Sequence, residues 1–104
     1  GFQQPTNIVI AELDLHFYNG ITPNGDGSNE VWIIDGIEQY PNNEISIFGR
    51  SGNQVWSGSS YDNTLVVFEG MNKNGNELPN GTYFYVMNIT SLGQKFKGWI
   101  EITR

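Results

Sequence analysis

Thr82-Tyr-Phe-Tyr-Val-Met-Asn-Ile-Thr90 is the stretch of sequence that decides the fold. Its odd-numbered residues are two tyrosines, a methionine and an isoleucine, and Phe84 and Val86 stand between them. A period of two is typical of a β-strand, because successive side chains point to opposite faces of a sheet. Apolar side chains on both faces near the start of the run predict a strand in the centre of its sheet.

Working outward from this run, the sequence predicts further short strands between clusters of Asn, Gly, Pro and Ser. They cover residues 9–17, 31–35, 44–48, 54–56, 65–68 and 95–103, of which 65–68 has the weakest pattern. Residues 50–53, with Gly52, are expected to form the turn of a hairpin. No window keeps helical spacing over three turns. We therefore predict an all-β fold, an immunoglobulin-like antiparallel β-sandwich of about seven strands in a single domain over residues 1–104.

The composition excludes several classes of function. The chain has 104 residues and no cysteine, so disulfides, a thiol nucleophile and a thiolate metal site are excluded. A formal net charge of −6 argues against binding to nucleic acid, and no apolar run approaches the ~18 residues of a membrane span. His16, the single histidine, lies among acidic residues without a matching nucleophile, so we expect it to be solvated. The sequence predicts a monomer that is not an enzyme.

Five short motifs carry a more specific signal. They begin with Thr22-Pro-Asn-Gly-Asp-Gly-Ser-Asn-Glu30 and Ile37-Glu-Gln-Tyr-Pro-Asn42, and continue with Ile45-Ser-Ile-Phe48 followed by Arg50 and Gly52, Leu78-Pro-Asn-Gly-Thr-Tyr-Phe-Tyr85, and Lys97-Gly-Trp-Ile-Glu-Ile-Thr-Arg104. In this order and spacing the chain resembles the gliding-motility-associated C-terminal domain of Bacteroidota, the type B sorting domain of type IX secretion. The resemblance covers about residues 20 to 104.

The resemblance implies a domain at the C-terminus of a large secreted or surface protein. Such a domain directs its cargo through the periplasm and across the outer membrane by the type IX machinery, with an outer-membrane protein as a partner. It acts by a folded recognition surface and not by catalysis. The chain departs from the family pattern at Asn29-Glu30, Gly49-Arg-Ser-Gly52 and Phe68-Glu-Gly70.

The glycine-rich loop at residues 22–30 has the spacing of a calcium site. Thr22, Asn24 and Asp26 alternate ahead of Glu30, and alternate oxygens of a tight loop can converge on a hard cation. The first position is not acidic, and Ile33 stands where calcium loops place a bidentate Glu. The alternative is an Asx-rich turn whose side chains bond their own backbone. The sequence leaves both interpretations open, and no other cofactor is expected.

Six residues are candidates for a partner-recognition surface. Most of the aromatic residues are expected in the core, and those that lie near turns or on a polar face are Trp56, Tyr61 and Trp99. The basic residues near the end of this acidic chain are Lys95, Lys97 and Arg104. The alternative for these three is a solvated edge strand, where lysine blocks pairing with other sheets.

A second function class fits the same aromatic residues, namely an accessory carbohydrate-binding or adhesion module of a cell-surface protein. Position and partner discriminate the two: a sorting domain carries a fused protein out of the cell, whereas the accessory module binds a glycan.

Overall fold

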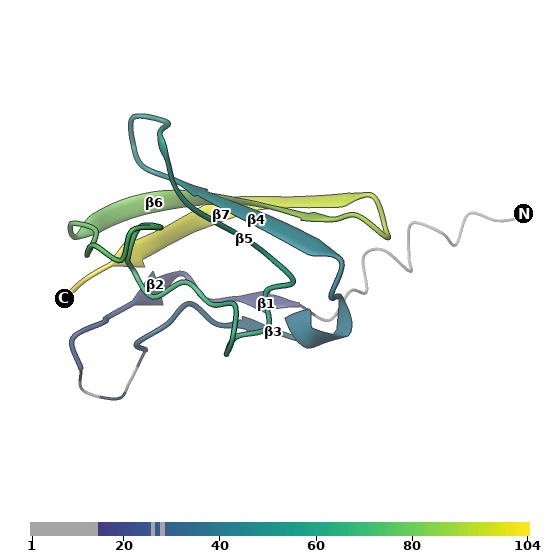
Figure 1. Cartoon of the computed structure of the whole chain (residues 1–104), viewed down its shortest axis with the longest axis horizontal. Coiled ribbons are helices and arrows are strands. Elements are labelled where there is room, and N and C mark those ends of the chain that lie inside the picture. Colours follow the sequence, from purple (N-terminus) through teal and green to yellow (C-terminus); the bar gives the residue numbers. More distant parts are fainter. Residues whose placement is uncertain (1–14, 26, 28) are drawn as a thin grey trace, which may run out of the picture.

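The computed structural model describes residues 15–25, 27 and 29–104, which form two layers (Figure 1). The larger sheet has five strands in the order β2 (Gly20–Ile21), β7 (Gln94–Ile102), β6 (Gly81–Ile89), β4 (Asn43–Phe48) and β5 (Gln54–Ser59). The smaller sheet pairs β1 (His16–Phe17) with β3 (Ile34–Asp35), and a 3-10 turn, η1 (Ile37–Gln39), follows it. Neighbouring strands are antiparallel except β2 and β7. This is the all-β, immunoglobulin-like sandwich predicted from the sequence.

The central strand is β6, as its two apolar faces predicted. It pairs over its whole length with β7 and over six residues with β4. Its odd-numbered side chains are buried on the inner face of the sheet, where Tyr85 packs 4.8 Å from Trp32 between ring centroids. Tyr85 stands opposite Gly98 of β7, and a Cβ at Gly98 would lie only 2.6 Å from the tyrosine ring. The glycine therefore makes room for the largest side chain in the middle of the sheet.

The second layer is held by side-chain hydrogen bonds more than by strand pairing. The Trp32 indole donates to the Tyr18 carbonyl at 2.7 Å. The buried Tyr61 hydroxyl donates to the Trp32 carbonyl at 2.6 Å and accepts from the Phe68 amide at 2.8 Å. One phenol thus joins two segments of the layer, and its burial raises the pKa of Tyr61.

The predicted strand at 65–68 is wrong, since this segment is not part of either sheet. The physical reason is a local turn: one carboxylate oxygen of Asp62 accepts from the amides of Thr64, Leu65 and Val66 at 3.0, 2.8 and 2.9 Å. The segment still lies beside the smaller sheet, because the Trp32 amide donates to the Phe68 carbonyl at 2.9 Å.

Other strand boundaries changed less. The predicted strand at 31–35 is reduced to β3, and the one at 54–56 extends to Ser59. Between the predicted strands at 9–17 and 31–35 the structure adds β2, which pairs with β7 only at Glu101 and Ile102. Most of the predicted strand at 9–17 lies outside the described residues, which include only its end in β1. Among the described residues, no helix has the length and apolarity that a membrane crossing needs.

Candidate partner-binding surface

The outer face of the five-stranded sheet carries a row of three aromatic side chains. Trp99 on β7 is paired in register with Phe84 on β6, and Phe84 with Phe48 on β4. Trp99 is 48% exposed, Phe84 is 45% exposed and Phe48 is half-buried. Directly opposite residues on neighbouring strands have Cβ atoms about 4.5–5.5 Å apart, so the three side chains are neighbours on this face. We call them the aromatic row.

Lys95 and Lys97 lie on the same face of β7 as Trp99, because every second residue of a strand points to the same side. Lys97 is in register with Val86, and Lys95 with Asn88. We call these two residues the lysine pair. Three of the six predicted recognition residues therefore come together, and they come together with Phe48 and Phe84, which sequence analysis did not single out.

The lysine pair also occupies an edge of the sheet, as the alternative interpretation predicted. Over residues 94–100 the described partner of β7 is β6 alone, because β2 pairs only with the end of the strand. Both lysines are exposed, and within the described part of the chain neither side chain makes an ion pair or hydrogen bond. An edge position and a recognition role are compatible, since both require accessible side chains.

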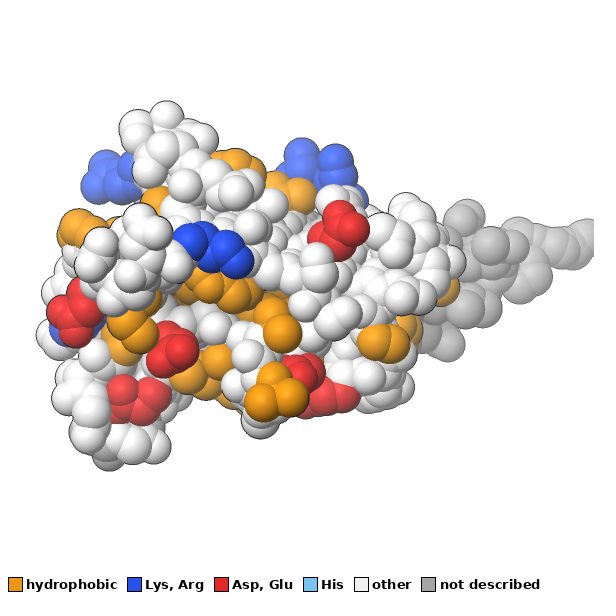
Figure 2. Space-filling view, in the orientation of Figure 1, with side chains coloured by type: hydrophobic (Ala, Val, Ile, Leu, Met, Phe, Trp, Pro, Cys, Tyr) orange, Lys and Arg blue, Asp and Glu red, His pale blue; other side chains and the backbone are white. Residues whose placement is uncertain are grey.

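Charge is unevenly distributed over the molecule. Figure 2 shows Lys and Arg side chains at the upper edge, where the five-stranded sheet lies, with hydrophobic side chains between them, and further basic side chains near the centre of the view. Most of the Asp and Glu side chains in this view lie over the lower half. On the outer face itself the acidic residues are Glu44, which Asn88 separates from Lys95 in one cross-strand row, and Glu101, whose carboxylate accepts a 2.6 Å hydrogen bond from Thr82.

Tyr61 is not part of a recognition surface, and that prediction is wrong. Its side chain is 1% exposed, and its ring packs edge-on against Trp32 at 5.6 Å. Trp56 is half-buried on the inner face of β5, where it packs against Tyr61 and Phe68. Its outer side is covered by Lys73, whose ammonium lies 5.5 Å from the ring centroid. The turn positions in the sequence suggested exposure, but Trp56 faces inward through its register with Ile47, and Tyr61 is held inward by its hydrogen bonds to Trp32 and Phe68.

Arg104 does not lie with the lysine pair either. Its guanidinium donates to the Gly70 carbonyl at 2.8 Å and to the Leu78 carbonyl, and its Nε lies 3.9 Å from the Glu77 carboxylate. The predicted cluster of three basic residues is therefore wrong, because Arg104 follows the far end of a nine-residue strand. Its contacts fasten the end of β7 to the 70–78 segment.

A family model described as the CHU_C type IX secretion signal domain matches residues 15–102, almost all of the described chain. The chain belongs to this family. The resemblance drawn from the five motifs is thereby confirmed, and the domain has a sorting-signal role. The type IX secretion signal domains are not a family of enzymes. Proteins that carry such a domain are exported to the cell surface or secreted.

Among solved structures the chain is similar to PorZ from Porphyromonas gingivalis, an essential bacterial surface component of the type IX secretion system. The TM-score is 0.61 at 14% identity, and the match covers 88% of this chain but 12% of PorZ. At this identity the similarity establishes the fold alone. No curated protein matches the chain in sequence.

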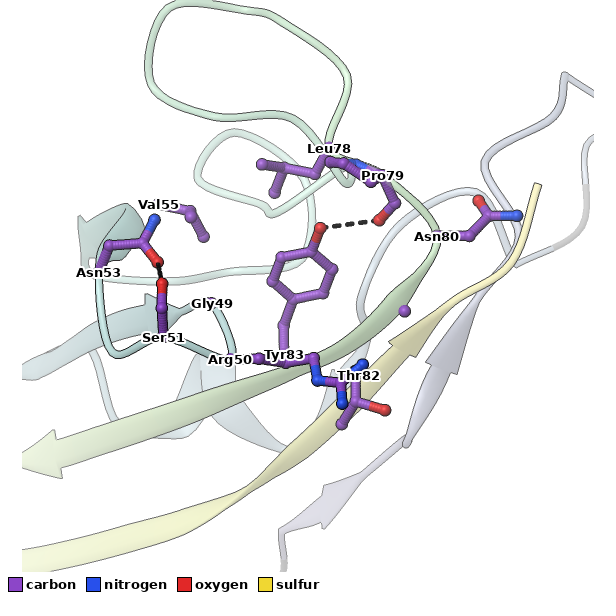
Figure 3. A pocket seen from close by; sticks show the side chains of 11 residues that line it. Gly49, Arg50, Ser51, Asn53, Val55, Leu78, Pro79, Asn80, Thr82 and Tyr83 are labelled. Atoms are coloured by element: carbon purple, nitrogen blue, oxygen red, sulfur yellow. Dashed lines mark hydrogen bonds between the residues drawn. The ribbon is translucent and has the colours of Figure 1, made fainter.

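Two of the family motifs meet at one end of the sandwich. The turn after β4 and the segment leading into β6 line a cavity of about 400 Å³ (Figure 3). The Tyr83 hydroxyl points toward Pro79 and donates to its carbonyl at 2.7 Å. Ser51 donates to the Asn53 side chain at 2.6 Å on the opposite wall. Each of these hydrogen bonds joins two residues of the same segment. The two segments therefore stabilise the local structure at this end of the sandwich.

The predicted calcium loop is only partly described, since Asp26 lies outside the described residues. The two carboxylate oxygens of Glu30 accept from the amides of Gly25 and Gly27 at 3.1 and 2.9 Å. The Thr22 amide donates to the Asn29 carbonyl at 2.7 Å, which closes the loop. These contacts are made by Glu30 and by the backbone, so the Asx turn and the calcium site both stay predictions. No group of three His, Cys, Asp or Glu side chains suited to a metal occurs among the residues that the structure describes.

His16 is exposed, as expected, with its ring packed edge-on against Tyr18 at 4.6 Å.

Proposed function

We propose that this domain directs an attached cargo protein from the periplasm across the outer membrane through the type IX machinery. The domain acts as a monomer, and an outer-membrane partner protein recognises its folded surface. The observation that carries the proposal is the match of the type IX secretion signal family over residues 15–102, which includes every strand of the sandwich. We expect the machinery to recognise the folded domain, because the outer face of the sheet combines residues from β4, β6 and β7.

A fusion experiment tests this function. The 104-residue chain is placed behind a fluorescent protein with a periplasmic export signal and expressed in a gliding bacterium of the Bacteroidota. We expect fluorescence at the cell surface or in the medium, and retention in the periplasm when the domain is omitted. Retention of the fusion while a known type B sorting domain carries the same reporter out would overturn the proposal.

A matched variant tests whether the fold is required. Tyr85→Ala removes a core ring and is expected to unfold the domain, whereas Leu65→Ala changes an exposed residue of the other layer and is expected to leave both fold and export unchanged. If the machinery recognises a folded surface, the Tyr85→Ala fusion stays in the periplasm even though the sequence of the signal is almost unchanged. Its export at the wild-type level would show that a linear peptide suffices.

The carbohydrate-binding alternative rests on the aromatic row, because exposed aromatic rings can stack on sugars. A glycan array with the purified domain separates the two functions. Binding that Trp99→Ala abolishes, together with failure of the fusion to leave the periplasm, would support an adhesion module instead.

A further inference from the structure

We propose that the aromatic row and the lysine pair together dock an acidic, partly apolar segment of the partner protein. This inference rests on the proposed function and adds to it the surface that is recognised and the chemistry of what it recognises. In the docked state, apolar side chains of the partner cover the aromatic row and its carboxylates face the lysine pair.

The apolar part of the argument is the exposure of the aromatic row. The large hydrophobic side chains that are exposed among the described residues are Tyr18, Leu65, Phe84, Leu92 and Trp99. Only Phe84 and Trp99 of these are in register on neighbouring strands, and Phe48 extends them to a third strand. Clustered exposed aromatic side chains mark binding surfaces, and Trp is the residue most often found at the energetic centre of an interface.

The electrostatic part of the argument is that neither lysine of the pair makes an ion pair within the described part of the chain. Neither lysine has an ion-pair partner among the described residues, although the chain carries eleven acidic and five basic residues. Glu44 lies in the same cross-strand row as Lys95 but is separated from it by Asn88 and makes no ion pair with it, and Glu101 accepts from Thr82. Two uncompensated cations beside an apolar surface, in a chain of net charge −6, favour a partner with carboxylates at this position.

The spacing on β7 sets the spacing expected of the partner. Lys95, Lys97 and Trp99 follow one another at every second residue, which is about 6.4–6.8 Å per step along a strand. A partner segment that runs along β7 therefore needs two carboxylates. One lies about one step from the side chain that covers Trp99, opposite Lys97, and the other about two steps away, opposite Lys95. β7 is held on one side by β6 and anchored at its end by β2, so this array is presented by a rigid element.

The test uses the reporter fusion described above with variants of equal net charge. Lys95→Gln with Lys97→Gln removes two positive charges from the proposed surface. Gln39→Glu with Leu65→Glu is the matched control, because it shifts the net charge by the same amount at two exposed positions of the other layer. We expect about a tenfold loss of export for the first pair and wild-type export for the control. Lys95→Arg with Lys97→Arg is expected to retain export, because the charges remain.

Trp99→Ala tests the apolar half of the surface, and we expect a loss of export of about tenfold or more. Limited proteolysis of each fusion verifies that the domain is folded. Wild-type export of either the Lys→Gln pair or the folded Trp99→Ala variant overturns the proposal, as does loss of export in the Lys→Arg pair. In each of these cases the wild-type fusion is still exported, so the proposed function stands. Failure of the wild-type fusion overturns the proposed function itself.

Discussion

On the inner face of β6, the ring of Tyr85 lies 4.8 Å from Trp32 and 5.2 Å from Phe17, whereas Phe84, the preceding residue, lies on the outer face and is nearly half exposed. The inner residues close a core and the outer ones present a surface, although both sets are aromatic. The comparison shows that residue type does not decide the role of an aromatic side chain in this fold. The role depends on whether the residue has an odd or an even position along the strand, and on whether a second layer covers the face to which it points.

The largest expected difference between the two faces is in stability. Tyr85→Ala removes a buried ring, and truncation of a buried aromatic side chain costs about 3–5 kcal/mol of the ~5–15 kcal/mol that stabilises a small domain. Phe84→Ala, one residue away, is expected to cost less than about 1 kcal/mol. Chemical denaturation of both variants measures the difference. Cooperative unfolding of Tyr85→Ala at the wild-type midpoint would break the comparison.

A second test adds volume to the inner face. A Cβ at Gly98 would lie 2.6 Å from the Tyr85 ring, so Gly98→Ala forces the ring to move and is expected to cost about 1–3 kcal/mol. Gly20→Ala is the control, because its Cβ would meet the Glu101 carbonyl at an ordinary 3.7 Å. Thermal melts of the two variants are compared. Equal stability would mean that the ring relaxes without cost and that the inner face is loosely packed.

The second layer depends on a buried hydroxyl. Tyr61→Phe leaves the Trp32 carbonyl and the Phe68 amide without this partner, and we expect a loss of about 1–3 kcal/mol. Phe84→Tyr is the outer-face counterpart and is expected to change stability little, since its hydroxyl would point to water. Denaturation midpoints of the two variants measure this contrast, and equal midpoints would contradict it.

The buried Tyr61 hydroxyl is also expected to make the stability of the domain depend on pH. Burial raises the folded-state pKa of Tyr61 above its ordinary value, so above about pH 10 the unfolded chain loses this proton while the folded chain keeps it. The stabilisation is fully present below pH 10 and falls as the pH rises further. Denaturation between pH 8 and 11 is expected to show this decline, and Tyr61→Phe is expected to reduce its slope. An unchanged slope would assign the decline to other groups.

The smallest effect is expected in the loop at residues 22–30. Glu30→Gln keeps the size of the side chain but weakens two charge-assisted hydrogen bonds from backbone amides, at a cost of about 1 kcal/mol. Because Glu30 already accepts from these amides, we expect melting curves in millimolar calcium and in chelator to superimpose. A rise of Tm in calcium that Asp26→Ala abolishes would instead establish the calcium site predicted from the loop spacing.

The sequence by itself determined those features that a pattern of neighbouring residues specifies. The alternation at 82–90 identified the central strand, because both of its faces are apolar and a single strand carries the whole pattern. The five motifs identified the family, because they occur in a fixed order over most of the chain. The segment at 65–68 could not be assigned in the same way, since the Asp62 carboxylate accepts from its first two amides, and from the Thr64 amide before them, and so replaces a strand partner there.

The tertiary structure decided which of the predicted site residues share a surface. Trp56, Tyr61 and Trp99 look alike in the sequence, yet strand pairing turns Trp56 inward and leaves Trp99 outside, while Tyr61, which follows β5, is buried by its hydrogen bonds to Trp32 and Phe68. The aromatic row likewise exists only through register, because it joins residues 48, 84 and 99, which are distant along the chain and belong to three strands. The physical reason is that the period of a strand fixes which side chains share a face, while only the pairing of strands and the position of the covering layer determine which face meets water.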